Sequence, residues 1–394
     1  MADLFNHQAA DASVAGVLSP GPEDISELLR GWGGEKPLLV CGGGTTSRCA
    51  STGLWTLDLR PGFDAKTVDP AMSSIRIGAG SRMGEVLDHL ASHRLTVPGG
   101  LSGWPGLGYV LTGGIGPLAR TQGLAVDRLL QIRGVWGSGD PFVLERSDDR
   151  CWRALCGAAP FLAVVTEVSL ATSPLCPLWI DQGLMPAADL PQRMALAERA
   201  PEAESLQWHW ADDEQVRWLA VAQQPSSSAV RIEGLHQLPS LGGAFSGSGR
   251  LHGEVIGLLG PAAATAWTEV MPTLTRLMRL RPHPGCTLSA QQLGGATARV
   301  PPQATAFVHR DAVWKPWITA MWPAGDAILR KRSLAWLEQL WAVLEPICPG
   351  VHLAQLHHHL PWHRRELRLA FGDRLEELRD LKARLDPNGN LPAL

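Results

Sequence analysis

The stretch VPGGLSGWPGLGYVLTGGIG, residues 97–116, contains eight glycines in twenty residues. Backbone without side chains at this density can approach a large flat or phosphorylated ligand closely, with its amide N–H groups directed at it. A second glycine-rich element, CGGGTTS at residues 41–47, follows an apolar run at 37–40 that is typical of a buried strand. One such loop alone is equally compatible with a tight turn. Two loops, separated by a strand and a helix, predict a dinucleotide site.

The composition places the chain among folded proteins of more than one lobe. It has 394 residues, of which 45% are hydrophobic and 19% charged, which is enough for two or three lobes with a large core. The net charge of −3 gives no electrostatic case for nucleic-acid binding. No apolar run approaches the roughly 20 residues of a membrane span, and the first residues do not resemble a secretory signal. We therefore expect a cytoplasmic protein with neither a nucleic-acid nor a membrane partner.

Seven cysteines occur at irregular spacing. This spacing is not that of a disulfide framework or of a CxxC metal site, so reduced thiols and no bound metal are predicted. The periodicity of apolar residues predicts helices at 20–30 and 83–90 and strands at 37–41, 74–77, 129–137 and 163–170. After about residue 174 the sequence pattern changes, and alternating apolar residues predict strands over 208–222. Helices are predicted at 261–280, 334–344 and 374–385, and a mobile loop at 242–249.

The order of several short motifs carries a family resemblance. Residues 15–173 resemble the flavin-binding domain of the vanillyl-alcohol oxidase/p-cresol methylhydroxylase (VAO/PCMH) superfamily, and the nearest branch is that of the berberine-bridge-enzyme-like oxidases. Two later segments, AFVHRDA at 306–312 and FGDRL at 371–375 with LKARLDP at 381–387, are similar to segments of the same branch. The motifs of the first domain are PEDI at 22–25, GGGTTS at 42–47, TVDP at 67–70, IGAG at 77–80, GEV at 84–86, the stretch 97–127 and VVTE at 164–167.

This resemblance implies an α+β fold in three parts. A two-subdomain PCMH-type FAD-binding domain would span residues 1–173. An α/β substrate domain with an antiparallel sheet flanked by helices would span 174–365, and a C-terminal segment, 366–394, would return to the first domain. FAD would lie between the two subdomains. The residues implied in its binding are Gly42, Gly43, Gly44, Thr45, Thr46, Ser47, Gly99, Gly100, Leu101, Ser102, Gly106, Gly108, Thr112, Gly113, Gly114, Gly116, Val164 and Val165.

The chain departs from the pattern of this branch in three places. Members commonly tether the flavin through a histidine in the first glycine loop and a cysteine in the second. Here the first loop has Thr45, Thr46 and Ser47 and the second has Leu101 and Ser102, so the expected FAD is noncovalent. The segment 157–163, GAAPFLA, would crowd the backbone beside the cofactor. Tyr109 is the one tyrosine of the whole chain, so the phenolates common in these active sites are largely missing.

Oxidation at a flavin needs a base for the hydroxyl or amine proton and a group that stabilises negative charge on the reduced ring. His309 could be that base, and Arg310 could stabilise reduced flavin or a substrate carboxylate. The alternative for this segment is a structural ion pair at a strand end. The run 357–359, three histidines, supplies His358 as a further catalytic candidate, because imidazole titrates near neutrality. For the aromatic residues, the expectation is a substrate pocket lined by Trp314, Trp317 and Trp322, with Trp104 close to the flavin.

The sequence thus predicts an FAD-dependent oxidoreductase, an oxidase or a dehydrogenase. It would take a hydride from an alcohol, amine or sugar-like small molecule and pass electrons to O₂ or another acceptor. One alternative is a degenerate, non-catalytic member that binds a ligand or partner, which the missing tethers favour. Another is a 2-hydroxy-acid dehydrogenase, favoured by the GGGT and DPNGNL (386–391) motifs. Such an enzyme would need cations for the carboxylate, from Arg310, Arg364 and Arg365.

Overall fold

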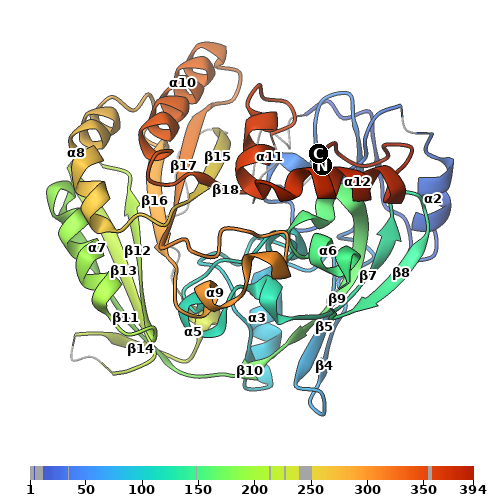
Figure 1. Cartoon of the computed structure of the whole chain (residues 1–394), viewed down its shortest axis with the longest axis horizontal. Helices are drawn as coiled ribbons and strands as arrows, with labels where there is room; N and C mark the ends of the chain where they lie inside the picture. The colour runs from blue at the N-terminus through green and yellow to red at the C-terminus, as the bar shows by residue number, and fades with distance from the viewer. Residues whose placement is uncertain are drawn as a thin grey trace.

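Two lobes built on β-sheets lie side by side, and the last two helices cross from one to the other (Figure 1). The computed structural model describes residue 4 and residues 12–33, 35–147, 149–212, 214–225, 228–238, 251–353 and 357–394. The loop expected at 242–249 lies outside these residues. The predicted α+β class is confirmed, with 34% helix and 28% strand. None of the described helices combines the length and the apolar character needed to cross a membrane.

The first lobe contains two sheets, as expected for a two-subdomain architecture. The smaller sheet is parallel, in the order β1-β3-β2, and the larger is antiparallel, in the order β4-β5-β9-β7-β8. The smaller sheet comprises β1 (Gly16–Leu18), β2 (Leu39–Cys41) and β3 (Trp55–Asp58), with α2 (Ile25–Gly31) and the 3₁₀ turn η1 (Ser47–Cys49). The larger sheet comprises β4 (Lys66–Asp69), β5 (Ser74–Gly78), β7 (Leu129–Trp136), β8 (Pro141–Glu145) and β9 (Ala163–Ala171).

Short helices join these strands and carry the second glycine stretch. Most of that stretch is loop, and only its middle forms a one-turn helix. These helices are α3 (Met83–Ser92), α4 (Leu107–Leu111), α5 (Ala119–Gln122), η2 (Ala125–Arg128) and α6 (Arg150–Leu162). The helix α6 is broken at Cys156 and Gly157, where Gly157 has a φ of +135°, so its C-terminal part turns independently of its first part. A two-stranded pair of β6 (Leu95–Thr96) and β10 (Ser173–Pro174) leads out of the lobe.

The second lobe is an eight-stranded antiparallel sheet in the order β14-β11-β13-β12-β16-β17-β15-β18. Its helices α7, α8 and α10 cover the face turned away from the first lobe (Figure 1). The strands are β11 (Leu178–Pro186), β12 (Glu204–Trp210), β13 (Gln215–Ala222), β14 (Val230–Ile232), β15 (Leu251–Leu259), β16 (Thr287–Gln292), β17 (Trp314–Pro323) and β18 (Gly350–His352). The helices and turns are η3 (Ala187–Asp189), α7 (Leu190–Arg199), η4 (Leu235–Gln237), α8 (Ala264–Arg279), α9 (Ala296–Arg299), η5 (Pro302–Ala304) and α10 (Ala327–Leu344).

The two faces of this sheet differ sharply in polarity. Side chains alternate between the faces along each strand, and the register pairs Ser289 with Trp317 and Gln291 with Lys315 on one face. On the other face, tryptophans of the strands pack against the helices, as in the edge-to-face contact of Trp208 with Trp267 of α8. The buried indoles therefore form the helix-side core, and the polar side chains of β16 and β17 face the first lobe.

The C-terminal segment closes the first lobe. It consists of α11 (His363–Phe371), α12 (Arg374–Leu385) and a turn that leads to Asn390. The buried side-chain amide of Asn390 donates to the carbonyls of Leu29 (2.8 Å) and Gly137 (2.9 Å), and the N–H of Leu38 donates to the Asn390 carbonyl (2.8 Å). Because Leu29 flanks the small sheet and Gly137 follows β7 of the large one, this asparagine joins the two subdomains.

Candidate functional site

A cavity of about 380 Å³ lies between the two glycine loops of the first lobe and the polar face of the eight-stranded sheet. Its size is within the range of small-molecule sites. One side is formed by backbone of residues 42–46 and 100–109, and the opposite side by β15 to β18. Ala159, Pro160 and Ala163 at the end of α6 close a third side. The segment 157–163 thus lies at the cavity, as the sequence predicted.

The glycine loops pack directly against each other. A Cβ atom on Gly43 would lie 2.2 Å from the amide nitrogen of Gly106, and one on Gly106 would lie 2.4 Å from that of Gly43. The Arg82 guanidinium donates from Nε to the Gly43 carbonyl (3.3 Å) and so holds the same junction. Glycine is needed at these two positions because the backbones of the two loops touch there. The absence of side chains also leaves space for a ligand.

Eleven of the eighteen residues predicted to bind the cofactor line the cavity, six others do not, and the side chain of Ser47 lies outside the described part of the chain. Gly116 packs on the carbonyl of Gly99, where a Cβ would lie 1.7 Å away, and Gly114 packs on Ala125. Val164 points into the core behind Val165. The lining residues are Gly42, Gly43, Gly44, Thr45, Thr46, Gly100, Leu101, Ser102, Gly106, Gly108 and Val165. The six others are Gly99, Thr112, Gly113, Gly114, Gly116 and Val164.

The sheet supplies polar side chains that the sequence analysis did not single out. Gln291 of β16, Lys315 of β17 and His352 of β18 line the cavity. Of the tryptophans expected there, Trp317 and Trp104 line it. Trp314 and Trp322 are fully buried and belong to the helix-side face of β17, so the expectation that they line this pocket is wrong.

Lys315 is the most perturbed of these groups. Its ammonium lies 4.3 Å from the ring centre of Trp317, and none of the described residues forms a salt bridge with it. Burial lowers the pKa of Lys315 to about 7, since an isolated cation loses its hydration there. Burial also lowers the pKa of His352, and the charge of Lys315 adds to this effect. His352 is therefore neutral near pH 7, and Lys315 titrates near pH 7.

The charges that line the cavity suit an anionic dinucleotide. Arg48 and Lys315 are its cations, and no aspartate or glutamate is found among the described lining residues. Thr45, Thr46 and Ser102 add hydroxyl groups beside the bare glycine backbone. Hydroxyls, backbone amides and a guanidinium are the donors that phosphate oxygens need. The residues present therefore fit the FAD that the resemblance implies.

Arg310 lies in an internal ion pair and does not line the cavity. Its guanidinium is 1% exposed and donates twice to the Asp127 carboxylate, at 2.9 Å each, and once to the Thr305 hydroxyl at 2.6 Å. Its Nε donates to the carbonyl of Phe307 at 3.0 Å. Arg310 was expected to stabilise reduced flavin or a substrate carboxylate, but its geometry matches the alternative, a structural ion pair. Arg310 fastens the segment to the turn that contains Asp127.

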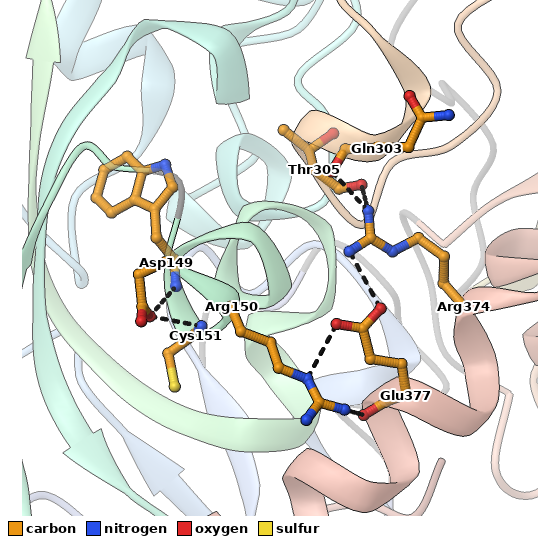
Figure 2. A network of polar contacts seen from close by, with 8 residues as sticks. Asp149, Arg150, Cys151, Gln303, Thr305, Arg374 and Glu377 are labelled. Carbon is orange, nitrogen blue, oxygen red and sulfur yellow. Dashed lines mark hydrogen bonds and ion pairs between the residues drawn. The ribbon is translucent and has the colours of Figure 1, made fainter.

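The same segment is held from its other side by the C-terminal helices. Figure 2 shows Arg374 of α12 directed at the residues before Arg310 and Glu377 placed between two arginines. Arg374 donates to the carbonyls of Gln303 (2.8 Å) and Thr305 (3.1 Å), and Glu377 accepts from Arg150 of α6 (3.0 Å). The segment thus joins the first lobe, the second lobe and α12.

The histidines expected to be catalytic also lie away from the cavity. His309 donates from Nε2 to the carbonyl of Leu369 (2.6 Å) and packs on Gly350, and burial lowers its pKa. His358 is half-buried, and burial together with the charge of His359 lowers its pKa to about 4. Neither residue lines the cavity, so their catalytic roles stay predictions without a supporting contact.

His357 and His359 belong to a carboxylate network behind the sheet. His357 contacts Glu366 through Nδ1 (2.7 Å) and Glu254 through Nε2 (3.5 Å), and His359 Nε2 contacts Glu254 (2.8 Å). Burial acts to lower the pKa of His357, but the two carboxylates outweigh it and raise the pKa. The network is a packed structural feature of the far side of β15.

Comparison with known proteins identifies the first lobe. Residues 18–144 match the family model of the FAD binding domain. Over 376 residues the chain is 23% identical to YgaK of Bacillus subtilis (strain 168), named an uncharacterized FAD-linked oxidoreductase, covering 82% of this chain and 76% of that protein. Four further curated relatives align over 24% to 40% of their own length.

Solved structures share the fold of the whole chain. A chitooligosaccharide oxidase superposes with a TM-score of 0.83 at 16% identity, covering 98% of this chain and 92% of that one. BBE-like 1 of Physcomitrella patens superposes with a TM-score of 0.81 at 17% identity, covering 98% and 93%. Both lobes and the returning C-terminal segment therefore belong to one known architecture.

Proposed function

Since this chain is an FAD-dependent oxidoreductase with the fold of the berberine-bridge-enzyme-like oxidases, we propose that it binds FAD noncovalently and oxidises an alcohol, amine or sugar-like hydroxyl held against Lys315. FAD, when bound, accepts the hydride that leaves the substrate carbon. The amine of Lys315 takes the hydroxyl or amine proton of the substrate. The position and lowered pKa of Lys315 carry this proposal.

A general base works best when its pKa lies near the working pH. An ordinary lysine is almost fully protonated at neutral pH, with a pKa of about 10.4. Lys315, with its pKa lowered to about 7, has a large neutral fraction that can accept a proton. His352 and Gln291 on the neighbouring strands can orient the substrate by hydrogen bonds from the same wall. Trp317 supplies an apolar surface beside them.

Noncovalent binding is supported by the side chains at the loop positions. Thr45, Thr46, Leu101 and Ser102 line the cavity, and none of them offers the imidazole or thiol that a flavin tether uses. We expect oxidised-flavin absorbance that passes fully into the supernatant when the protein is precipitated with acid. Flavin that stays in the pellet would contradict this part of the proposal.

The role of Lys315 is tested with Lys315→Met, which keeps the length of the side chain but removes the amine. Flavin reduction is followed by stopped-flow absorbance with a panel of primary alcohols, amines and sugars. For any substrate that reduces the wild type, we expect the variant to lose about 10²–10⁴-fold in rate, together with the rise of rate through pH 7. Lys331→Met on the exposed face of α10 is the matched control. A variant that keeps both rate and pH profile would refute the proposal.

A 2-hydroxy acid is the second candidate substrate, because the charged side chains that line the cavity are cationic. None of the three arginines expected for this role, Arg310, Arg364 and Arg365, lines the cavity. Arg310 pairs with Asp127, and Arg365 pairs with Glu345. Arg48 and Lys315 can bind the carboxylate instead. A 2-hydroxy acid should then reduce the flavin faster than its methyl ester, with a preference that weakens as salt increases. Equal rates for acid and ester would exclude this candidate.

A further inference from the structure

Two cysteines bracket the first glycine loop. Cys41 ends β2 and Cys49 ends η1, and the seven residues between them contain the loop that lines the cavity. Both side chains are buried, at 0% and 3% exposure, and they belong to one small apolar cluster with Ala50. Cys49 also lines the cavity itself, so a small solute in the cavity has a route to its sulfur.

Strand β3 fixes both cysteines at the same place. Cys41 is paired with Asp58 in the parallel ladder of β2 and β3. The carbonyl of Cys49 accepts a hydrogen bond from the hydroxyl of Thr56 (2.9 Å), which precedes Asp58 by two residues on the same strand. The two side chains pack in one buried cluster and each shifts the pKa of the other, so the two thiols are neighbours in the reduced protein.

The two thiols have different chemical character. The hydrogen bond to Cys49 and burial raise the pKa of Cys41, which therefore keeps its proton. The same hydrogen bond lowers the pKa of Cys49, against the effect of burial, and the positive charges of Arg60 and Arg48 lower it further. A thiolate next to cations is the reactive form of cysteine, and a neighbouring protonated thiol can resolve its oxidation.

We propose that Cys41 and Cys49 form a peroxide-reactive dithiol site whose disulfide ties together the two ends of the FAD loop. In the first step the Cys49 thiolate attacks hydrogen peroxide, the O–O bond breaks, and Cys49 sulfenic acid and hydroxide form. In the second step the Cys41 sulfur attacks the sulfenic sulfur, and the S–O bond breaks as a disulfide and water form. The two thiols lose two electrons, and peroxide is reduced to water and hydroxide.

FAD in the cavity should protect this site. Thr46 lines the cavity beside Cys49, and while Cys49 is protonated the Thr46 carbonyl accepts its S–H at 2.9 Å. A disulfide has to break this contact and so shift the loop that binds the cofactor. Protection rests on the proposed FAD site, whereas the formation of the disulfide does not. If only the cavity without FAD reacts, FAD at ten times its Kd slows oxidation about tenfold, because the open fraction falls by that factor.

The experiment is peptide mapping after treatment with hydrogen peroxide. Trypsin cuts after Arg48 and thereby separates the two cysteines, so the disulfide links the peptides 31–48 and 49–66. The purified protein is treated with and without added FAD, the reaction is stopped with an alkylating reagent, and the linked pair is quantified by mass spectrometry. We expect the linked pair to form in the protein without added FAD and about tenfold more slowly with it. The exposed thiol of Cys176 is the internal control, with a rate that FAD leaves unchanged.

Two variants separate the steps. Cys41→Ser should stop at Cys49 sulfenic acid, which a dimedone adduct traps, and Cys49→Ser should leave Cys41 as a thiol. Absence of the linked pair in folded wild-type protein whose Cys176 is oxidised would overturn the proposal. A linked pair that forms equally fast with saturating FAD would overturn the protection while leaving the dithiol site. A protein that forms the pair but never takes up FAD would contradict the proposed function alone.

Discussion

Replacing Arg310 by methionine removes the charge from the most completely buried arginine–carboxylate pair among the described residues and keeps much of the volume. Asp127 then keeps its carboxylate at 9% side-chain exposure without a cation. Its Oδ2 still accepts the N–H of Leu124 (3.0 Å), but both bonds from Arg310 are lost. The bonds of the guanidinium to Thr305 and Phe307 are lost as well, so the segment that joins the two lobes loses its main anchor.

The size of the effect follows from burial. Removing one partner of a buried pair costs about 3–5 kcal/mol, because the remaining charge lacks compensation. For 394 residues the entropy of unfolding is about 0.8 kcal/mol per kelvin, at roughly 2.1 cal/mol/K per residue. We therefore expect Arg310→Met to lower Tm by about 4–6 °C in a single cooperative transition. The control Arg279→Met removes an exposed pair with Glu214 (57% and 73% exposure) and should leave Tm unchanged within error.

Differential scanning calorimetry measures the change, and stopped-flow reduction of the bound flavin is recorded on the same samples. A double variant, Arg310→Met with Asp127→Asn, should recover part of the loss, because it removes the uncompensated charge. If Arg310→Met left Tm equal to that of the Arg279 control and abolished flavin reduction, Arg310 would act on substrate or cofactor. That result would refute its structural role and restore the role that the sequence analysis gave it.

Two further predictions concern the loop junction and the histidine network. Gly43→Ala should abolish FAD uptake, measured by absorbance titration, because its Cβ would lie 2.2 Å from the amide of Gly106. The control Gly31→Ala, at the end of α2 and away from the cavity, should bind normally because its Cβ would meet no atom within 4 Å. Uptake by both variants alike would disprove the close contact. The raised pKa of His357 adds stability that is complete below its unfolded pKa of about 6.5 and is lost as pH rises through the folded value. The urea midpoint of the wild type should therefore fall above pH 6.5, and Glu366→Gln should flatten this fall. The control Glu376→Gln, which removes an exposed pair with Arg379, should follow the wild type. If the midpoints of the two variants depend on pH in the same way, Glu366 is not the source of the pH-dependent stability.

The fold and the loop side of the site could be predicted because both depend on local sequence. The apolar run at 37–40 and the glycines after it specify a strand and a tight loop whatever the rest of the chain does. The contact between Gly43 and Gly106 joins two such loops 63 residues apart, and it was not predicted from either loop alone. The order of such motifs was enough to predict the fold and FAD as the cofactor. It did not separate glycines that line the cavity from those, such as Gly116, that pack inside the lobe.

The sheet side of the site could not be predicted because it depends on register between distant strands. Gln291 and Lys315 meet only because β16 pairs with β17. A partial signal was present in the sequence of β17, because its residues alternate between the two faces of the sheet and Lys315 is a charged residue in a mostly apolar strand. A lysine at such a position indicates a polar face, and the same alternation would have separated Trp317 from Trp314. Nothing local to Arg310 indicates that Asp127, 183 residues earlier, is its partner.

The bonds of Asn390 have a consequence for the synthesis of the protein. Its amide bridges Leu29 and Gly137, on the two subdomains that flank the cofactor cavity. The ribosome completes both subdomains long before it reaches residue 390. The Asn390 amide, which joins the two subdomains, is therefore synthesised only after the whole second lobe. A chain arrested before residue 390 would contain every glycine loop and still lack the amide that joins the two subdomains.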